Sequence, residues 1–579
     1  MTDGISASRR QFLHSAALVT SGMFLSGCVR RIPTWLPPVE PRDPLTVDVH
    51  CHFFNGTDLQ MQRFLQYVVD ANGDHPGDAI AAPLAQDINW LFAPTGKSEM
   101  RKLHSGNSET DARDKWKKAH AASYRKFRDQ LMQHRAEAGL TEGGGAAAGS
   151  SLSGATKTDS RAWPKKYEDH EHYLRGRPDL AAGSLPAFEE YFQYRYVALA
   201  DYLDLYNNSA SKRTMDLMIA HLVDYDWPLN NGKPTRTPLS VQVKLMERIS
   251  VMSHGRVHTF APFDPFREIA YRAGIRGANW SALDAVQKWV ALHGCIGVKI
   301  YPPMGFAPYG NCEIDSGHWC GVWDWLRDVE HVPDGKGGHG TIGQRLDDVL
   351  CELYTWCLDN DLPVMAHTAL SNGLNKKFES FTKAKHWAAL REQFGKLRVN
   401  FGHLGGFEKT SAADWNMISA PSPSSVNVRD LVALMSPDSA APGGRFFGDS
   451  AYSEMVLSDP ACLLGVYDAA LSWTAPGQVR PVLPDRLMYG SDWSLLMLEE
   501  EMQKYFADFV SMYLQLDKSR PASGESQVSL SDRFFGANAI DYLGLRDGRG
   551  RQRLANFYAT HGMTFDQGQQ PVWMEKIKS

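Results

Sequence analysis

Short apolar runs alternate with longer amphipathic stretches along most of this chain. The runs are rich in β-branched and aromatic residues, and they occupy positions 45–53, 215–223, 256–262, 294–301, 362–367, 397–403, 445–450 and 486–491. Most of the stretches between them carry apolar residues at helical spacing. Strands that alternate with helices in this way form parallel sheets with crossover connections. Eight such strands predict a TIM-like (β/α)8 barrel, whose active site lies at the carboxyl ends of the strands.

The segment between the first two predicted strands is far too long for an ordinary loop. It covers 55–212 and contains helical patterns at 59–69 and 187–206, with a link rich in glycine, alanine and serine at 143–151. We predict a large helical insertion after the first strand, placed where it could serve as a lid over the barrel mouth. A loop insertion is expected at 302–342, and its glycines lack the strand-to-helix context of a phosphate-binding loop.

Composition and charge limit the class of partner. Hydrophobic residues make up 43% and charged residues 22% of the 579 positions, which is typical of a folded globular protein. The length is sufficient for one large barrel with insertions, over residues 45–579. The formal net charge of −5 provides no basic footprint, so nucleic-acid binding has no electrostatic support and a small-molecule partner is favoured.

The N-terminus has the features of an export signal. Positions 8–13, SRRQFL, resemble a twin-arginine signal, and an uncharged, mostly apolar stretch follows at 15–27. Positions 25–28, LSGC, resemble a bacterial lipobox. The resemblance implies removal of 1–27, lipidation of Cys28, a linker over 28–44 and anchoring on the periplasmic side of a bacterial membrane. Val29 after the cysteine favours the outer membrane.

The cysteines do not indicate a disulfide framework. Without Cys28, seven of the eight cysteines remain, an odd and scattered set. Cys312 and Cys320 lie in a loop-like stretch, where an oxidising compartment would allow either a bridge or two free thiols.

Two histidines stand two positions apart at the end of the first predicted strand. Side chains at this spacing share one face of a strand, so His50 and His52 point the same way. Two imidazoles at a strand end form half of a metal site, although such a pair alone also fits an accidental or core arrangement. Three later runs end in His367, His403 and Asp492, at the same edge of the predicted barrel.

This order of residues resembles the amidohydrolase superfamily, in particular the amidohydrolase-related branch that also contains decarboxylases. Members carry Asp-x-His-x-His on the first strand, histidines ending the fifth and sixth, an aspartate ending the eighth and a closing Gly-Asn-Ala helix. The matching residues are Asp48, His50, His52, His367, His403 and Asp492. The closing element departs by one residue, as GANA at 536–539. The resemblance covers 45–300 without the insertion, and 345–545.

The resemblance implies a centre for a divalent metal, with zinc as the expected ion. His50, His52 and His367 would supply nitrogen ligands, and Asp492 would bind the metal and accept a proton from the attacking water. His403 would act as general acid or base in a site with one metal, or help to hold a second ion. Alternatively, His403 would have a purely structural role and bond a backbone carbonyl.

Lys299 bears on the number of metal ions. Positions 297–302, GVKIYP, resemble the fourth-strand segment in which relatives carry a carbamylated lysine that bridges two metals. An unmodified lysine at a strand end would instead pair with a substrate carboxylate or a neighbouring acid. One ion is therefore expected, and two if Lys299 is carbamylated.

Other polar residues in or beside the apolar runs have weaker signals. His221, His258 and His293 match no family position and are interpreted as ordinary hydrogen-bonded histidines. Asp449 ends the seventh run, where it could contact substrate. Asp48 is expected one layer below the histidines, as an acceptor that orients them.

Three functions fit these features. The leading prediction is a metal-dependent hydrolase that directs metal-activated water at an amide, lactone or ester of a small molecule. A metal-dependent non-oxidative decarboxylase would use the same ligands. A catalytically retired, lipid-anchored binding protein would use the insertion as its interface, and the intact ligand set argues against this third reading.

Overall fold

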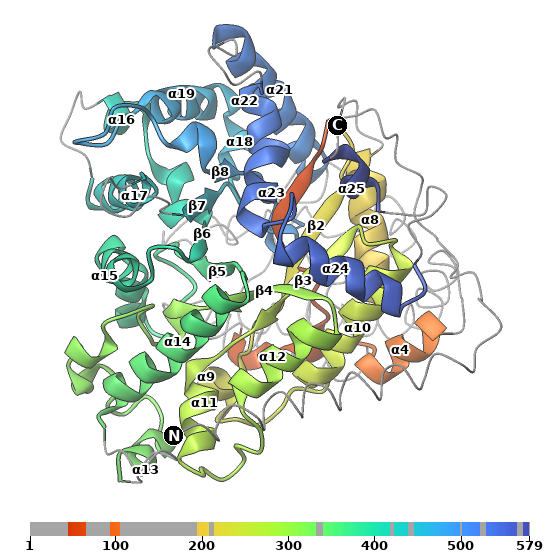
Figure 1. Ribbon diagram of the computed structural model, residues 1–579. Helices are drawn as coiled ribbons and strands as arrows, with labels where there is room; N and C mark the ends of the chain where they lie inside the picture. The colour runs from red at the N-terminus through yellow and green to blue at the C-terminus, as the bar shows by residue number, and fades with distance from the viewer. Residues whose placement is uncertain are drawn as a thin grey trace, which may run out of the picture.

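The computed structural model contains one sheet of eight parallel strands, each paired with the next in sequence order (Figure 1). The strands are β1 (Val47–Cys51), β2 (Leu217–His221), β3 (Val257–Pro262), β4 (Cys295–Ile300), β5 (Val364–His367), β6 (Arg398–Gly402), β7 (Arg445–Asp449) and β8 (Leu487–Met488). Backbone bonds from Val49 N to the Tyr489 carbonyl and from Ser491 N to the His50 carbonyl, both 3.1 Å, join the last strand to the first. The predicted TIM-like barrel is confirmed.

The structure describes residues 44–64, 93–104, 194–207, 213–331, 340–416, 422–437, 445–497, 501–520, 528–563 and 571–577. The predicted export signal at 1–27, the predicted lipidation site Cys28 and the link at 143–151 lie outside these ranges. Within them, no helix combines the length and the apolar character that crossing a membrane requires.

Helices follow the strands around the outside of the barrel (Figure 1). They are α2 (Met61–Phe64), α4 (Gly96–His104), α8 (Arg195–Asn207), α9 (Asp226–Asn230), α10 (Leu239–Met252), α11 (Pro265–Arg272), α12 (Ala282–Leu292), α13 (Trp325–His331), α14 (Ile342–Asp359), α15 (Ala384–Phe394), α16 (Ala412–Asn416), α17 (Pro423–Leu434), α18 (Met455–Ser458), α19 (Pro460–Ser472), α20 (Trp493–Leu496), α21 (Tyr505–Ser519), α22 (Leu530–Asp532), α23 (Asn538–Leu543), α24 (Arg549–Thr560) and α25 (Val572–Lys576). Helix α14 shows how the sequence determines such an element. It begins at a capping box between Thr341 and Gln344 and buries Leu346, Val349 and Leu353, spaced three and four apart.

The C-terminal helices close the amino end of the barrel. Inward-facing strand residues, among them Val49, Ile219 and Met365, form one buried cluster with residues of α23, α24 and α25. The Tyr542 hydroxyl of α23 donates to the Val364 carbonyl at 3.0 Å. Because apolar side chains fill this end, the polar strand residues gather at the carboxyl end.

The described parts of the first insertion pack against the barrel. Helix α2 falls within the predicted helical stretch 59–69, and most of α8 falls within 187–206. The Tyr202 hydroxyl of α8 donates to Asp48 of β1 at 2.8 Å. The centroid of the Tyr202 ring lies 5.0 Å from that of the Trp493 ring. A role as a lid stays a prediction, since most of the insertion lies outside the described residues.

The second predicted insertion, 302–342, is built from short turns over its described part. The 3-10 helices η6 (Pro302–Met304), η7 (Asn311–Glu313) and η8 (Ser316–His318) precede α13. Cys312 and Cys320 are both exposed free thiols, so the structure has no bridge between them.

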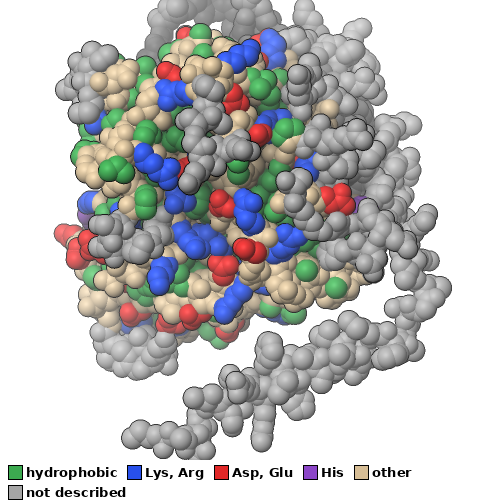
Figure 2. All heavy atoms as spheres, turned by 45° about the horizontal axis from the view of Figure 1, so that its top comes forward, with side chains coloured by type: hydrophobic (Ala, Val, Ile, Leu, Met, Phe, Trp, Pro, Cys, Tyr) green, Lys and Arg blue, Asp and Glu red, His purple; other side chains and the backbone are tan. Residues whose placement is uncertain are grey.

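Charged side chains of both signs are interspersed over the face shown in Figure 2. Neither sign forms a continuous patch among the side chains described on this face, in keeping with the small net charge of −5.

Candidate metal centre

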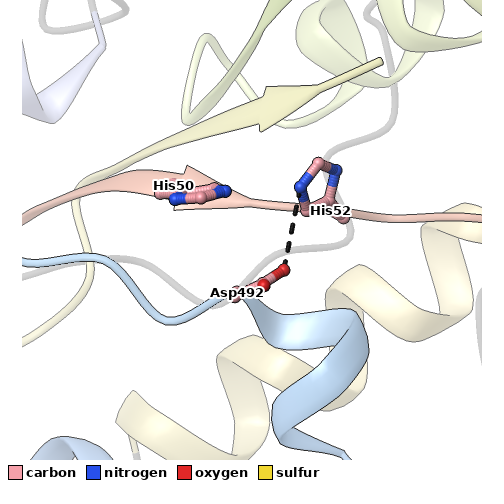
Figure 3. A group of neighbouring side chains, drawn as sticks. All are labelled: His50, His52 and Asp492. Atoms are coloured by element: carbon pink, nitrogen blue, oxygen red, sulfur yellow. Dashed lines mark ion pairs between the residues drawn. The ribbon is translucent and has the colours of Figure 1, made fainter. Parts of the chain in front are cut away.

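Three of the predicted ligands meet at the carboxyl end of the barrel. His50 and His52 project from β1 and the segment after it, and Asp492 lies where the chain turns from β8 into α20 (Figure 3). One ligand atom from each lies within 4.8 Å of the others. His52 Nε2 is 3.7 Å from Asp492 Oδ1. The side chains are buried, so water does not compete freely for these atoms.

Both imidazoles are held through their Nδ1 atoms. His50 Nδ1 lies 3.1 Å from Asp449 Oδ2, and His52 Nδ1 lies 2.8 Å from the His221 carbonyl oxygen. Donation from Nδ1–H leaves Nε2 as the lone-pair nitrogen of each ring. His50 Nε2 is buried without a hydrogen-bond partner in the described part of the protein. A buried lone pair without a donor is the state expected of a metal ligand before binding.

The charge states also fit a cation. Burial lowers the pKa of His50 far below its ordinary value and that of His52 to about 3, so both rings are neutral at pH 7. Burial raises the pKa of Asp492 to about 7, and the Lys299 ammonium opposes this shift. Among the described residues, no group donates a hydrogen bond to the Asp492 carboxylate. A buried carboxylate in this state is costly unless a cation compensates it.

His403 borders the group on the other side of Asp492. Its Nδ1 lies 2.9 Å from the Ala451 carbonyl oxygen, and its Nε2 lies 3.8 Å from Asp492 Oδ2. The ring is therefore fixed by a carbonyl while Nε2 still faces the site. The carbonyl contact of the structural alternative is present, and the catalytic role of His403 stays a prediction.

His367 lies one ring further away. Its ring centroid is 4.7 Å from that of His403, which in turn is 4.8 Å from that of His50. His367 does not belong to the group formed by His50, His52 and Asp492. Its Nε2 is buried, and no described residue bonds it, so it too offers a free lone pair.

Lys299 is buried at the centre of the same end of the barrel. Its Nζ lies 3.1 Å from the Met365 sulfur and forms no ion pair with any described carboxylate. Burial lowers its pKa to about 8, against the opposing charges of Asp449 and Asp492. The expected pairing with a neighbouring acid is absent within the described ranges, and the carbamate and the substrate contact stay predictions.

Backbone conformation is unusual at two of these positions. His403 and Asp492 have φ values of 60° and 50°, in the left-handed region that non-glycine residues rarely adopt. The Asp492 N–H donates to the His50 carbonyl at 2.7 Å, which holds the turn in place. A Cβ at Gly490 would lie 2.9 Å from His50 Cβ. The surroundings thus impose a conformation that brings Asp492 beside β1.

The Asp449 carboxylate holds several groups of the site in place. Its carboxylate interacts with His50 Nδ1 and accepts from Asn400 Nδ2 at 2.7 Å, His403 N at 2.8 Å and Ala451 N at 3.1 Å. These donors surround the carboxylate, and the expected substrate contact stays a prediction. The position at the end of a predicted strand was the only sequence signal for it.

Asp48 holds the backbone of His50 and bonds no imidazole ring among the described residues. It accepts from His50 N at 3.0 Å, from the Tyr202 hydroxyl and from the Ser491 hydroxyl. The expectation that it orients the histidine rings directly is wrong. It instead joins β1, α8 and the segment before Asp492.

The three remaining histidines behave differently from one another. His258 bonds the Tyr558 hydroxyl and the Gly294 carbonyl, and His293 bonds Glu247, as expected for ordinary histidines. His221 Nε2 lies 2.8 Å from the Val49 carbonyl, while its own carbonyl accepts from His52. His221 therefore supports the candidate metal centre by joining β1 to β2, which the sequence did not indicate.

Replacement of Asp449 by asparagine is expected to lower the metal affinity of the purified protein by roughly 10- to 100-fold. Asparagine retains the shape but loses the charge that interacts with His50 Nδ1–H. Competition with a chromogenic zinc chelator measures the change. Asp324→Asn, at an exposed position, is the control, and equal affinity in the two variants would contradict the orienting role.

Comparison with known proteins gives structural neighbours only. No family model and no curated protein matches the chain. A protein from Lactobacillus casei, described as a candidate metal-dependent hydrolase, is 13% identical and covers 89% of this chain and 97% of its own, with TM-score 0.37. An amidohydrolase from Burkholderia multivorans with bound zinc is 12% identical and covers 57% of this chain and 83% of its own, with TM-score 0.29. The 2,6-dihydroxybenzoate decarboxylase from Rhizobium is 12% identical and covers 57% of this chain and 85% of its own, with TM-score 0.30. At such low values, any functional assignment depends on the site residues themselves.

Proposed function

We propose that this protein is a metal-dependent hydrolase of the amidohydrolase superfamily. The observation that carries the proposal is the buried Asp492 carboxylate, which faces His52 Nε2 and His403 Nε2 at 3.7 and 3.8 Å and accepts no hydrogen bond from a described residue. Neutral imidazoles around a buried carboxylate form a donor set that suits zinc. The resemblance of the strand-end residues to the superfamily supports the same assignment.

The donor set assigns roles to individual residues. His50, His52 and Asp492 would hold the ion, and His367 would join them through its free Nε2. A bound divalent ion lowers the pKa of a coordinated water and polarises a substrate oxygen. Lys299, buried beside the group, would determine whether a second ion is held.

The chain's own groups would handle the proton. Asp492 has one oxygen near His52 and the other near His403, so it can accept a proton from a nucleophilic water and pass it on. His403 Nε2 is the nearest second acceptor, because its Nδ1 is committed to the Ala451 carbonyl. The proton would then reach the leaving group from His403.

A panel of small esters, lactones and amides tests the reaction class. We expect the zinc-loaded protein to hydrolyse at least one of them, to lose this activity after chelation and to regain it when zinc is restored. Release of carbon dioxide from aromatic carboxylic acids, without hydrolysis of the panel, would instead assign non-oxidative decarboxylation to the protein. Full zinc occupancy without turnover of either panel would contradict an enzymatic function.

Export and location enter the proposal from the sequence alone. We propose that the enzyme acts on the periplasmic side of a bacterial membrane, held by a lipid at Cys28, because the twin-arginine and lipobox patterns occur in tandem. Metabolic labelling with a radioactive fatty acid, compared between the native chain and Cys28→Ala, tests the anchor. Equal labelling of the two would contradict it.

A further inference from the structure

Aromatic side chains stack directly on two of the candidate ligands. Phe54 lies on the ring of His52, with centroids 4.8 Å apart and planes 15° apart. Tyr301 lies on the ring of His367, at 4.7 Å and 17°. One edge of the candidate metal centre is therefore apolar and aromatic.

These rings belong to a separate hydrophobic cluster at the carboxyl end of the barrel. It contains Tyr225, Tyr301 and Met304, with Phe54, Phe64 and Leu374 partly buried against it. Tyr225 follows β2 and Tyr301 follows β4, so both come from strand ends at the same edge as the site. The Tyr301 ring also stacks on His367, which places this cluster beside the candidate centre.

The two tyrosine side chains are neighbours in this cluster. Their rings are 5.7 Å apart, and both side chains are more than nine-tenths buried. Each hydroxyl has one proton, and even a bond between the two hydroxyls would use only one of them. Among the described residues, neither hydroxyl has another hydrogen-bond partner. One proton of the pair is therefore left without an acceptor.

A purely structural role explains this pair poorly. Phenylalanine at both positions would fill the same apolar cluster without burying two hydroxyls and an unused donor, whose desolvation costs free energy. A donor retained in an apolar wall next to a metal centre fits the recognition of a ligand oxygen.

We propose that the Tyr225–Tyr301 hydroxyl pair donates a hydrogen bond to an oxygen of the substrate, and that the substrate carries a compact apolar or aromatic body against Phe54. The proposal rests on the function proposed above, because it places the ligand at the same centre. Lys299, whose Nζ lies 5.7 Å from the centroid of the Tyr301 ring, adds positive charge on the same side.

Binding of phosphonates to the zinc-loaded protein tests the proposal. Benzylphosphonate offers tetrahedral oxygens and an aromatic body, and methylphosphonate offers the oxygens alone. By isothermal titration calorimetry, we expect benzylphosphonate to bind at least about tenfold more tightly than methylphosphonate. The double variant Tyr225→Phe, Tyr301→Phe is expected to bind benzylphosphonate about tenfold more weakly. This loss corresponds to the free energy of one hydrogen bond to a charged group. Zinc content and the melting temperature are expected to stay unchanged.

Tyr354→Phe is the matched control, because this buried tyrosine bonds the Pro308 carbonyl away from the site. Wild-type affinity in the double variant, or equal binding of the two phosphonates, would overturn the inference. If the double variant does not fold, the single variants decide: a loss of fivefold or more in one supports the inference, and no loss in either overturns it. Absence of zinc from the wild-type protein would instead refute the proposed function, so the two failures are distinguishable.

Discussion

Replacement of His52 by alanine is expected to lower the zinc affinity roughly a thousandfold, equivalent to about 4 kcal/mol. His52 Nε2 is the nitrogen nearest to Asp492 Oδ1, at 3.7 Å, and its ring is already aligned by the His221 carbonyl. Alanine removes a pre-oriented ligand and leaves the buried carboxylate with one fewer partner for the ion. Hydrolytic activity should fall in parallel at substoichiometric zinc.

Competition with a chelator of known affinity measures this loss, and circular dichroism verifies the fold. His318→Ala is the matched control, because this histidine lies on the exposed turn η8 outside the barrel mouth. The control should bind zinc as the wild type does. A His52→Ala protein that retains wild-type affinity would remove His52 from the centre.

Replacement of Arg195 by methionine is expected to destabilise the protein by about 3–5 kcal/mol. Arg195, the first residue of α8, forms ion pairs with Asp58 and Glu99, and all three side chains are fully buried. Methionine would leave two carboxylates buried without their counter-charge. Since these residues join the described parts of the insertion, α8 and α4 should loosen from the barrel together.

Urea unfolding monitored by tryptophan fluorescence gives the change in free energy of unfolding. Arg276→Met, at an exposed position, is the control and should remain within about 0.5 kcal/mol of the wild type. Adding Asp58→Asn and Glu99→Gln to Arg195→Met should recover much of the loss, because the uncompensated charges are then absent. A loss below about 1 kcal/mol in Arg195→Met would show that this cluster does not anchor the insertion.

The strands were predictable because their composition and length are local properties of the chain. Every predicted run contains a strand, with the largest difference at the last one. The run 486–491 yields only β8, Leu487–Met488, although Ser491 and Asp492 after it still donate backbone hydrogen bonds to the His50 carbonyl of β1. The left-handed conformation of Asp492 has no local sequence signal.

The residues of the candidate centre were predictable in type but not in arrangement. His50, His52 and Asp492 come together as the order of the strands implies, whereas His367 contacts the ring of His403 and does not belong to that group. The orienting role of Asp449 depends on four groups that β6, β7 and β1 bring together from distant positions. Such contacts arise from tertiary packing, which the spacing of residues along one chain does not encode.

Metal content tests the central claim most directly. The protein is purified without chelators, loaded with zinc and desalted. Its zinc content is measured by inductively coupled plasma mass spectrometry, and its concentration is measured by amino-acid analysis. We predict about one zinc ion per chain, or two if Lys299 is carbamylated, with the second lost in Lys299→Ala. A content far below one ion per chain, in protein that circular dichroism shows to be folded, would contradict the metal centre.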